Sequence, residues 1–181
     1  MEDHSDMVEP IHAESFFSVS TSGEVHERLC FEYDDPNGFY QRVLQDEGAF
    51  KLEIEKLSSN MQYYLDKERV EINGKRVTSE VHYTDIFLKG ETHIVAVVYL
   101  IDFRGPFTPG TNKIETWLEE EKAPYPFEIM WRFPIGTRKI SIESLLEHEV
   151  YDDVVVLWAD EGDSVGGYES MTFALPLARM R

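Results

Sequence analysis

Apolar and polar residues alternate along much of this chain, and a period of two is typical of half-buried β-strands. Such segments, each bounded by turn-forming residues, recur from residue 16 to residue 175. We expect strands in the following segments: 16–21, 24–33, 50–55, 61–65, 69–72, 75–78, 81–88, 94–101, 127–133, 138–142, 150–158 and 168–175. The segment 94–101 is apolar on both faces, which predicts a strand inside a layered core.

Turn residues indicate which of these strands are neighbours. Asn73-Gly74 separates two short alternating segments and favours a two-residue type I′ turn, because both positions of that turn need positive φ. A second hairpin is expected over residues 81–103, turning near Lys89-Gly90. A last hairpin is expected to join 150–158 with 168–175 through a glycine-rich loop.

Helical signals are fewer than strand signals. Residues 36–48 are expected to form a helix, because Asp35 suits its N-cap, Gly48 suits its end, and apolar residues between them recur at spacings of three and four. A second short helix is expected over Asn112–Lys122, with Asn112 as the cap and Glu115 three residues later.

This succession of elements predicts a mainly β fold. Strands that follow one another without intervening helices favour an antiparallel β-sandwich or a partly closed barrel, with one or two short helices. An α+β arrangement is the alternative. Residues 1–14 show no periodicity and are expected to form a flexible acidic arm, followed by a single β-rich domain over residues 15–181.

The net charge of −18 narrows the choice of partners. Residues 1–50 hold 12 acidic and two basic side chains, so the charge is unevenly distributed. Direct binding to nucleic acid is disfavoured, because neutralising phosphates requires clustered lysine and arginine. A solvated acidic surface explains the imbalance most simply, and a surface that meets a basic protein partner is the functional alternative.

The chain lacks the signs of export or membrane insertion. Its first residues are acidic, whereas a signal peptide needs a basic region and an apolar core. The most apolar run, 94–101, is far shorter than the roughly 20 residues of a spanning helix. A single cysteine, Cys30, fits a reducing compartment. We therefore expect a cytoplasmic protein without membrane contact.

The motifs that resemble reaction centres fail on context. Gly162-Asp163-Ser164-Val165-Gly166 matches the G-x-S-x-G nucleophile pattern, but no histidine follows it, so the serine would have no base. His82 and His93 are expected too far apart along their hairpin to share a metal ion. We therefore predict no catalytic residue, no metal site and no cofactor, although a carboxylate pair assembled by folding would leave no local trace.

Two loops combine proline with aromatic residues and form the predicted interaction surface. Tyrosine, tryptophan and arginine often anchor interfaces, and proline lowers the entropy cost of ordering a loop. The alternative is that these rings plug the open end of a sandwich. The residues of this surface are Phe103, Arg104, Phe107, Tyr125, Phe127, Trp131, Arg132 and Phe133.

These observations favour a non-catalytic accessory or binding protein that acts through protein contacts and self-associates as a homodimer. The first alternative is a β-barrel with a pocket that binds a small molecule or carries out a reaction. The second alternative is an acidic mimic of nucleic acid. Whether the protein is an enzyme is left open by the sequence, with the absence of motifs favouring a protein that is not.

Overall fold

The computed structural model describes residues 8–90 and 93–176. Within these residues the chain forms twelve strands and two helices. In chain order they are β1 (Glu9–Val19), β2 (Glu24–Asp34), α1 (Phe39–Val43), α2 (Glu47–Lys67), β3 (Arg69–Ile72), β4 (Lys75–Val77), β5 (Glu80–Leu88), β6 (Ile94–Arg104), β7 (Gly110–Lys122), β8 (Phe127–Arg132), β9 (Arg138–Glu143), β10 (Glu147–Tyr151), β11 (Val154–Ala159) and β12 (Ser164–Leu175).

The strands build two sheets. Seven strands lie in the order β10-β11-β8-β1-β2-β6-β5, and five lie in the order β4-β3-β7-β12-β9. Neighbouring strands are antiparallel except β1 and β8, which are parallel. The described strands form a sandwich-like pair of sheets and no closed barrel, which confirms the predicted mainly β class.

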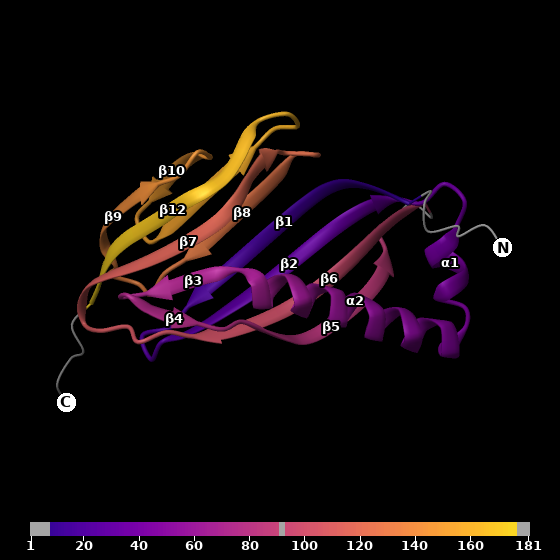
Figure 1. Cartoon of the computed structure of the whole chain (residues 1–181), viewed down its shortest axis with the longest axis horizontal. Helices are drawn as coiled ribbons and strands as arrows, with labels where there is room; N and C mark the ends of the chain where they lie inside the picture. Colours follow the sequence, from indigo (N-terminus) through magenta and orange to yellow (C-terminus); the bar gives the residue numbers. More distant parts are fainter. Residues whose placement is uncertain (1–7, 91–92, 177–181) are drawn as a thin grey trace.

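The seven-stranded sheet has one covered face and one open face. The five-stranded sheet covers one end of the inner face, and α2 covers the other end (Figure 1). The core between the sheets includes Val25, Phe133 and Phe173, and the core beneath α2 includes Val97 and Ile101. The opposite, outer face of the seven-stranded sheet is not covered by any described element.

The prediction of strands at 50–55 and 61–65 is wrong, because both segments belong to the 21-residue helix α2. The alternation of Phe50, Leu52 and Ile54 was misleading, since Leu52 is 70% exposed. The apolar residues that pack onto the sheet instead follow helical spacing. They are Phe50, Ile54, Leu57, Met61 and Leu65. Asp46 starts the helix, with its side chain accepting a hydrogen bond from the Ala49 amide at 2.8 Å.

The predicted helix over Asn112–Lys122 is also wrong, because this segment is the long strand β7. Asn112 caps no helix. Its side chain is buried, accepts a hydrogen bond from the Thr108 amide at 2.8 Å and donates to the Thr108 and Gly110 carbonyls at 2.7 and 2.8 Å. It thus organises the turn before β7.

Three further expectations need correction. Residues 9–14 of the predicted arm belong to β1, and residues 1–7 lie outside the described part of the chain. The helix expected over residues 36–48 is only α1, because the chain turns at Asp46 and Gly48 already lies in α2. The last predicted hairpin does not form, since β11 pairs within one sheet and β12 within the other.

Other local predictions are confirmed. Asn73 and Gly74 adopt φ of 51° and 75° between β3 and β4, as the two-residue turn requires. β5 and β6 form the hairpin expected over residues 81–103. The Asp35 carboxylate accepts hydrogen bonds from the Phe39 and Tyr40 amides at 2.8 and 2.7 Å, so it does stabilise the start of α1.

Candidate functional site

An apolar row crosses the outer face of the seven-stranded sheet. The strand register places six residues side by side, from β11 to β5. These residues, named here the apolar row, are Val156, Met130, Phe16, Arg28, Leu100 and Tyr83. Tyr83 is 52% exposed, Phe16 41% and Leu100 38%. Arg28 is the one charged member, and its guanidinium donates to a Glu14 carboxylate oxygen at 3.0 Å.

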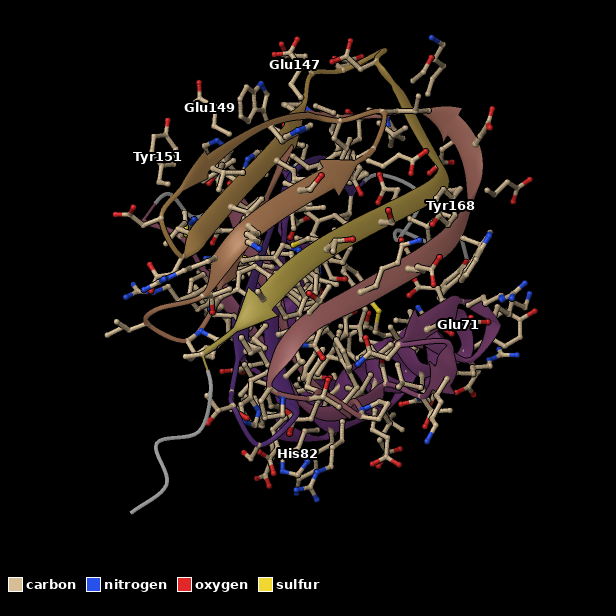
Figure 2. All side chains as sticks on the ribbon, turned by 90° about the vertical axis from the view of Figure 1, so that its left-hand side faces the viewer. Glu71, His82, Glu147, Glu149, Tyr151 and Tyr168 are labelled. Atoms are coloured by element: carbon tan, nitrogen blue, oxygen red, sulfur yellow. The ribbon has the colours of Figure 1, made fainter. Side chains whose placement is uncertain are left out.

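A second row next to it carries acidic side chains, and we name it the acidic row. Its members are Glu147, Trp158, Glu128, Glu14, Cys30, Val98 and Asp85. Within the described residues, neither Glu147 nor Glu128 forms an ion pair. On the edge strand β10, Glu147, Glu149 and Tyr151 point outward on the same side (Figure 2). Among the described residues, the apolar row is thus bordered by two carboxylates without an ion-pair partner, Glu147 and Glu128, and by Glu14, which pairs with Arg28.

Cys30 lies in the middle of the acidic row but is buried against Ala96 and Val98. Burial raises the pKa of the Cys30 thiol, which disfavours the thiolate. Cys30 therefore lacks the exposure and the ionisation of a reactive cysteine.

Folding brings two histidines, His26 and His82, to the same aspartate. A bulge in β5 between Val81 and Tyr83 shifts His82 toward Asp102. Asp102 lies 2.7 Å from His26 Nδ1 and 4.0 Å from His82 Nδ1. The His26 and His82 side chains are 63% and 75% exposed, so water solvates both. Among the described residues, no three histidine, cysteine or acidic side chains are placed to hold a metal ion.

Ser164 does not sit on a nucleophile elbow. It begins β12 and accepts a hydrogen bond from the Lys122 ammonium at 2.8 Å. The glycines that follow it form a bulge against β7, where a side chain at Gly166 would meet the Glu119 carbonyl oxygen at 2.1 Å. The glycine-rich pattern therefore serves backbone packing.

The predicted interaction surface is mostly core. Phe103, Trp131 and Phe133 are buried between the sheets, and Trp131 stacks on Phe17 with ring centroids 3.9 Å apart. Phe107 and Phe127 pack against the same core, and Tyr125 is half-buried. Only the two arginines are well exposed: Arg104 pairs with Glu24 at 3.0 Å and Arg132 with Asp153 at 3.6 Å. The burial of the rings agrees with the alternative that they plug the sandwich.

A carboxylate on the inner face was not anticipated. Glu27 is half-buried and accepts a hydrogen bond from the Ser15 hydroxyl at 2.5 Å. Burial, with a smaller contribution from the charge of Glu68, raises the pKa of Glu27 to about 7. The alternation of β2 indicated two mixed faces but could not show which one would be covered.

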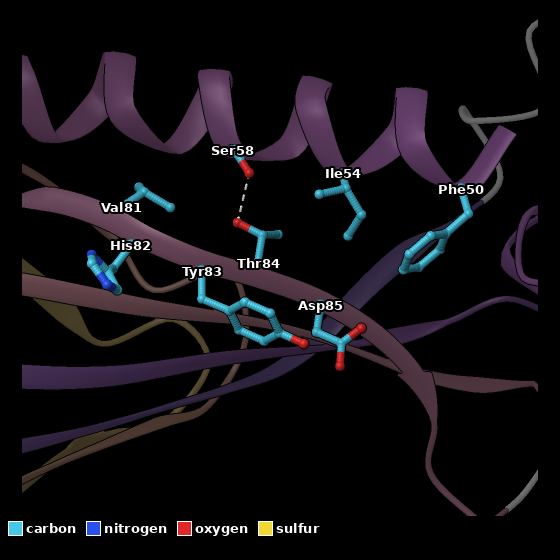
Figure 3. Close-up of a pocket in the computed structure, with 8 residues that line it drawn as sticks. All are labelled: Phe50, Ile54, Ser58, Val81, His82, Tyr83, Thr84 and Asp85. Carbon is cyan, nitrogen blue, oxygen red and sulfur yellow. Dashed lines mark hydrogen bonds between the residues drawn. The ribbon is translucent and has the colours of Figure 1, made fainter. Parts of the chain in front are cut away.

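Two hollows lie at the margins of the sheet. A groove of about 440 Å³ lies between α2 and β5, and Figure 3 shows Phe50 and Ile54 of the helix above the strand. A second hollow of about 710 Å³ lies where β4 passes the ends of β2 and β6. The groove is lined by Phe50, Ile54, Ser58, Val81, His82, Tyr83, Thr84 and Asp85.

Comparisons with known proteins assign no family. No protein-family model matches the chain, and no curated protein does. Among solved structures, an aminopeptidase N family protein from Idiomarina loihiensis is similar with a TM-score of 0.40 at 10% identity, over 88% of this chain and 29% of that one. A "putative protease" from Parabacteroides distasonis is similar with a TM-score of 0.34 at 10% identity, over 94% of this chain and 41% of that one. The chain thus spans less than half of either structure.

Neither helix of the described chain is long and apolar enough to span a membrane.

Proposed function

We propose that this protein is a non-catalytic binding protein that holds a basic protein partner against the outer face of its seven-stranded sheet. The observation that carries the proposal is the apolar row. Five of its six members are apolar or aromatic, on a face that no described element covers. An uncovered face of an antiparallel sheet is ordinarily polar. An exposed apolar row on such a face is therefore typical of a binding surface.

The exposed side chains supply a driving force for association. Phe16, Leu100 and Tyr83 each retain 38–52% of their surface in water. Burying the remaining exposed surface of each of these side chains would contribute about 1 kcal/mol to the binding free energy. Aromatic side chains on rigid strands also lose little conformational entropy on binding. Such a row is suited to anchoring a partner through a few central contacts.

The charge pattern supports a basic partner over a second copy of this chain. The acidic row borders the apolar row, and the chain as a whole carries −18. Two copies meeting face to face would each bring these carboxylates into the contact, and like charges there oppose association. A partner that presents an apolar ridge flanked by lysine or arginine would match both rows.

Affinity capture with matched variants tests the proposal. Leu100→Lys places a charge in the apolar row, and Thr172→Lys places the same charge on the outer side of β12 in the other sheet. Each is compared with the wild type for thermal stability and for capture of partners from cells of the source organism. A photo-crosslinking residue at Phe16 then identifies what touches the row.

The expected result is a basic protein that crosslinks at Phe16 and is retained by Thr172→Lys but bound at least about tenfold more weakly by Leu100→Lys. Raising the salt concentration should speed its dissociation, because exposed charges are screened. Unchanged capture by Leu100→Lys would contradict the proposal. So would a two-copy particle that dissociates only in Leu100→Lys, since it would assign the face to self-association.

A further inference from the structure

The free edge of β5 combines an open backbone with a side-chain groove. β5 is the last strand of the seven-stranded sheet and pairs only with β6 among the described strands. Helix α2 runs alongside it, and the groove of about 440 Å³ lies between the two (Figure 3). An exposed strand edge is a template for another strand unless the protein blocks it.

The phase of the β5–β6 hydrogen bonds shows which backbone groups face outward. The Lys89 amide donates to the Ile94 carbonyl at 2.9 Å, which makes these two residues a hydrogen-bonded pair. Hydrogen-bonded and non-hydrogen-bonded residue pairs alternate along an antiparallel ladder. Thr84, Ile86 and Leu88 therefore direct their amides and carbonyls away from β6.

Part of this edge is already capped by side chains. The Gln62 amide group donates to the Ser79 carbonyl at 3.0 Å, and its oxygen accepts from the Val81 amide at 2.9 Å. The Gln62 side chain therefore forms the hydrogen bonds at the start of β5 that the backbone of a neighbouring strand would otherwise form. Further along, the Asp85 carboxylate accepts from the Ile86 amide at 2.9 Å.

These side-chain caps leave open backbone groups between and beyond them. Within the described chain, no hydrogen bond reaches the outward backbone groups of Thr84 or Leu88. Thr84 is held only through its side chain, whose hydroxyl accepts from the Ser58 hydroxyl at 2.7 Å. The groove wall beside this open stretch is apolar, with Phe50 and Ile54 one helical turn apart. Open backbone and apolar wall thus meet at Thr84, and the open backbone continues past the groove to Leu88.

We propose that an extended segment of a partner protein adds to β5 as an eighth strand, pairing with the backbone of Thr84, Ile86 and Leu88. One apolar side chain of the segment enters the groove beside Phe50 and Ile54. Its two sequence neighbours point to the outer face, as alternation requires. A carbonyl of the incoming segment accepts the hydrogen bond from the Ile86 amide and so frees the Asp85 carboxylate, which can then meet a basic neighbour. The segment therefore has a basic–apolar–basic pattern.

A second copy of this chain does not fit the same place. Two β5 edges could pair about a two-fold axis. In each copy, however, the inward-facing Ile86 is only 3% exposed, because it packs into that copy's own core. A second copy would therefore have no free inward side chain to place in the groove, and its own α2 would lie against the first. A flexible basic segment has neither obstacle, and the charge of −18 favours its approach.

A synthetic peptide of alternating lysine and valine, seven residues long, is the probe. We expect saturable binding by fluorescence anisotropy, with slowed hydrogen exchange at the Thr84 and Leu88 amides. Two further peptides carry N-methyl groups on alternate residues, in opposite phases. Because successive amides of a strand point to opposite sides, only one alternate set donates to β5. Methylating that set should weaken binding by at least about tenfold, and methylating the other set should leave it unchanged.

Protein variants give a matched comparison. Ser58→Lys fills the groove, whereas Asn60→Lys adds the same charge on the exposed side of the same helix. Loss of binding in the first but not the second supports the proposal. Absence of saturable binding, equal sensitivity to both methylation phases, or exchange protection confined to the outer face would overturn it. A dimer that forms through Thr84 and Leu88 and excludes the peptide would overturn it as well.

Discussion

Replacing Glu27 with glutamine should stabilise this protein above neutral pH and leave its stability nearly unchanged in mild acid. Glu27 lies half-buried on the inner face of β2, where its pKa is raised from 4.5 to about 7, mainly by burial. Glutamine has almost the same shape and can still accept the hydrogen bond from Ser15. The substitution therefore removes the cost of a buried charge while keeping the local contact.

The sign and size of the stability change follow from the difference in proton binding between the folded and the unfolded chain. Between pH 4.5 and about 7 the unfolded chain loses its proton while the folded chain keeps it, so stability falls as the pH rises through this window. Each unit of pKa difference corresponds to about 1.4 kcal/mol, which sets an upper limit of about 3 kcal/mol. Since Glu27 retains some contact with water, we expect about 1–3 kcal/mol.

Urea denaturation at about pH 5 and about pH 8, compared through the midpoints of the two curves, measures this difference. Glu27→Gln should be more stable than the wild type by about 1–3 kcal/mol at the higher pH and by well under half of that value at the lower pH. Glu128→Gln, on the exposed outer face, controls for the change in net charge and should stay within about 0.5 kcal/mol of the wild type. If Glu27→Gln changes stability equally at both pH values, Glu27 does not carry the buried charge inferred here.

The remaining predictions concern the backbone and the strand edge. Gly166→Ala should destabilise the fold by more than about 2 kcal/mol in denaturant melts, because the new Cβ would overlap the β7 backbone. The control Gly74→Ala, at a glycine with open space around it, should cost only about 1 kcal/mol. Asp35→Ala should cost about 1–3 kcal/mol, since two amides at the start of α1 lose a buried acceptor; a smaller loss would show that water replaces it. Gln62→Ala should speed hydrogen exchange of the Val81 amide by about tenfold while leaving amides in the centre of β6 unchanged, and equal speeding of both would indicate global destabilisation instead.

Turn chemistry and the period of apolar residues were enough to predict several local elements. Asn73-Gly74 specified its hairpin because few other dipeptides adopt positive φ at both positions. The doubly apolar segment 94–101 was correctly predicted as a strand, and Val95 and Val97 lie in the core, but its other face lies on the uncovered side of the sheet, where Leu100 is 38% exposed. These features depend on neighbours in sequence, so the sequence alone reveals them.

Helix α2 shows where local patterns fail. Its residues carry apolar side chains at both two-residue and four-residue spacings, and only packing against β5 and β6 determines which spacing is used. Likewise, Asn112 has the chemistry of a helix cap, but in the structure β7 pairs with β12 on one side and with β3 on the other. Tertiary contacts override weak local preferences in both segments.

The sequence by itself determined the class of this protein: a chain rich in short apolar segments, strongly acidic, and without a recognisable reaction motif. Only the tertiary structure decided which faces are covered. Pairing distant strands aligned Phe16, Leu100 and Tyr83 into one exposed row, brought His26 and His82 to the same aspartate, and buried the aromatic loop residues that the sequence offered as a surface. Burial is a property of the whole packed chain, because each face of a strand is alike in sequence until another layer covers one of them.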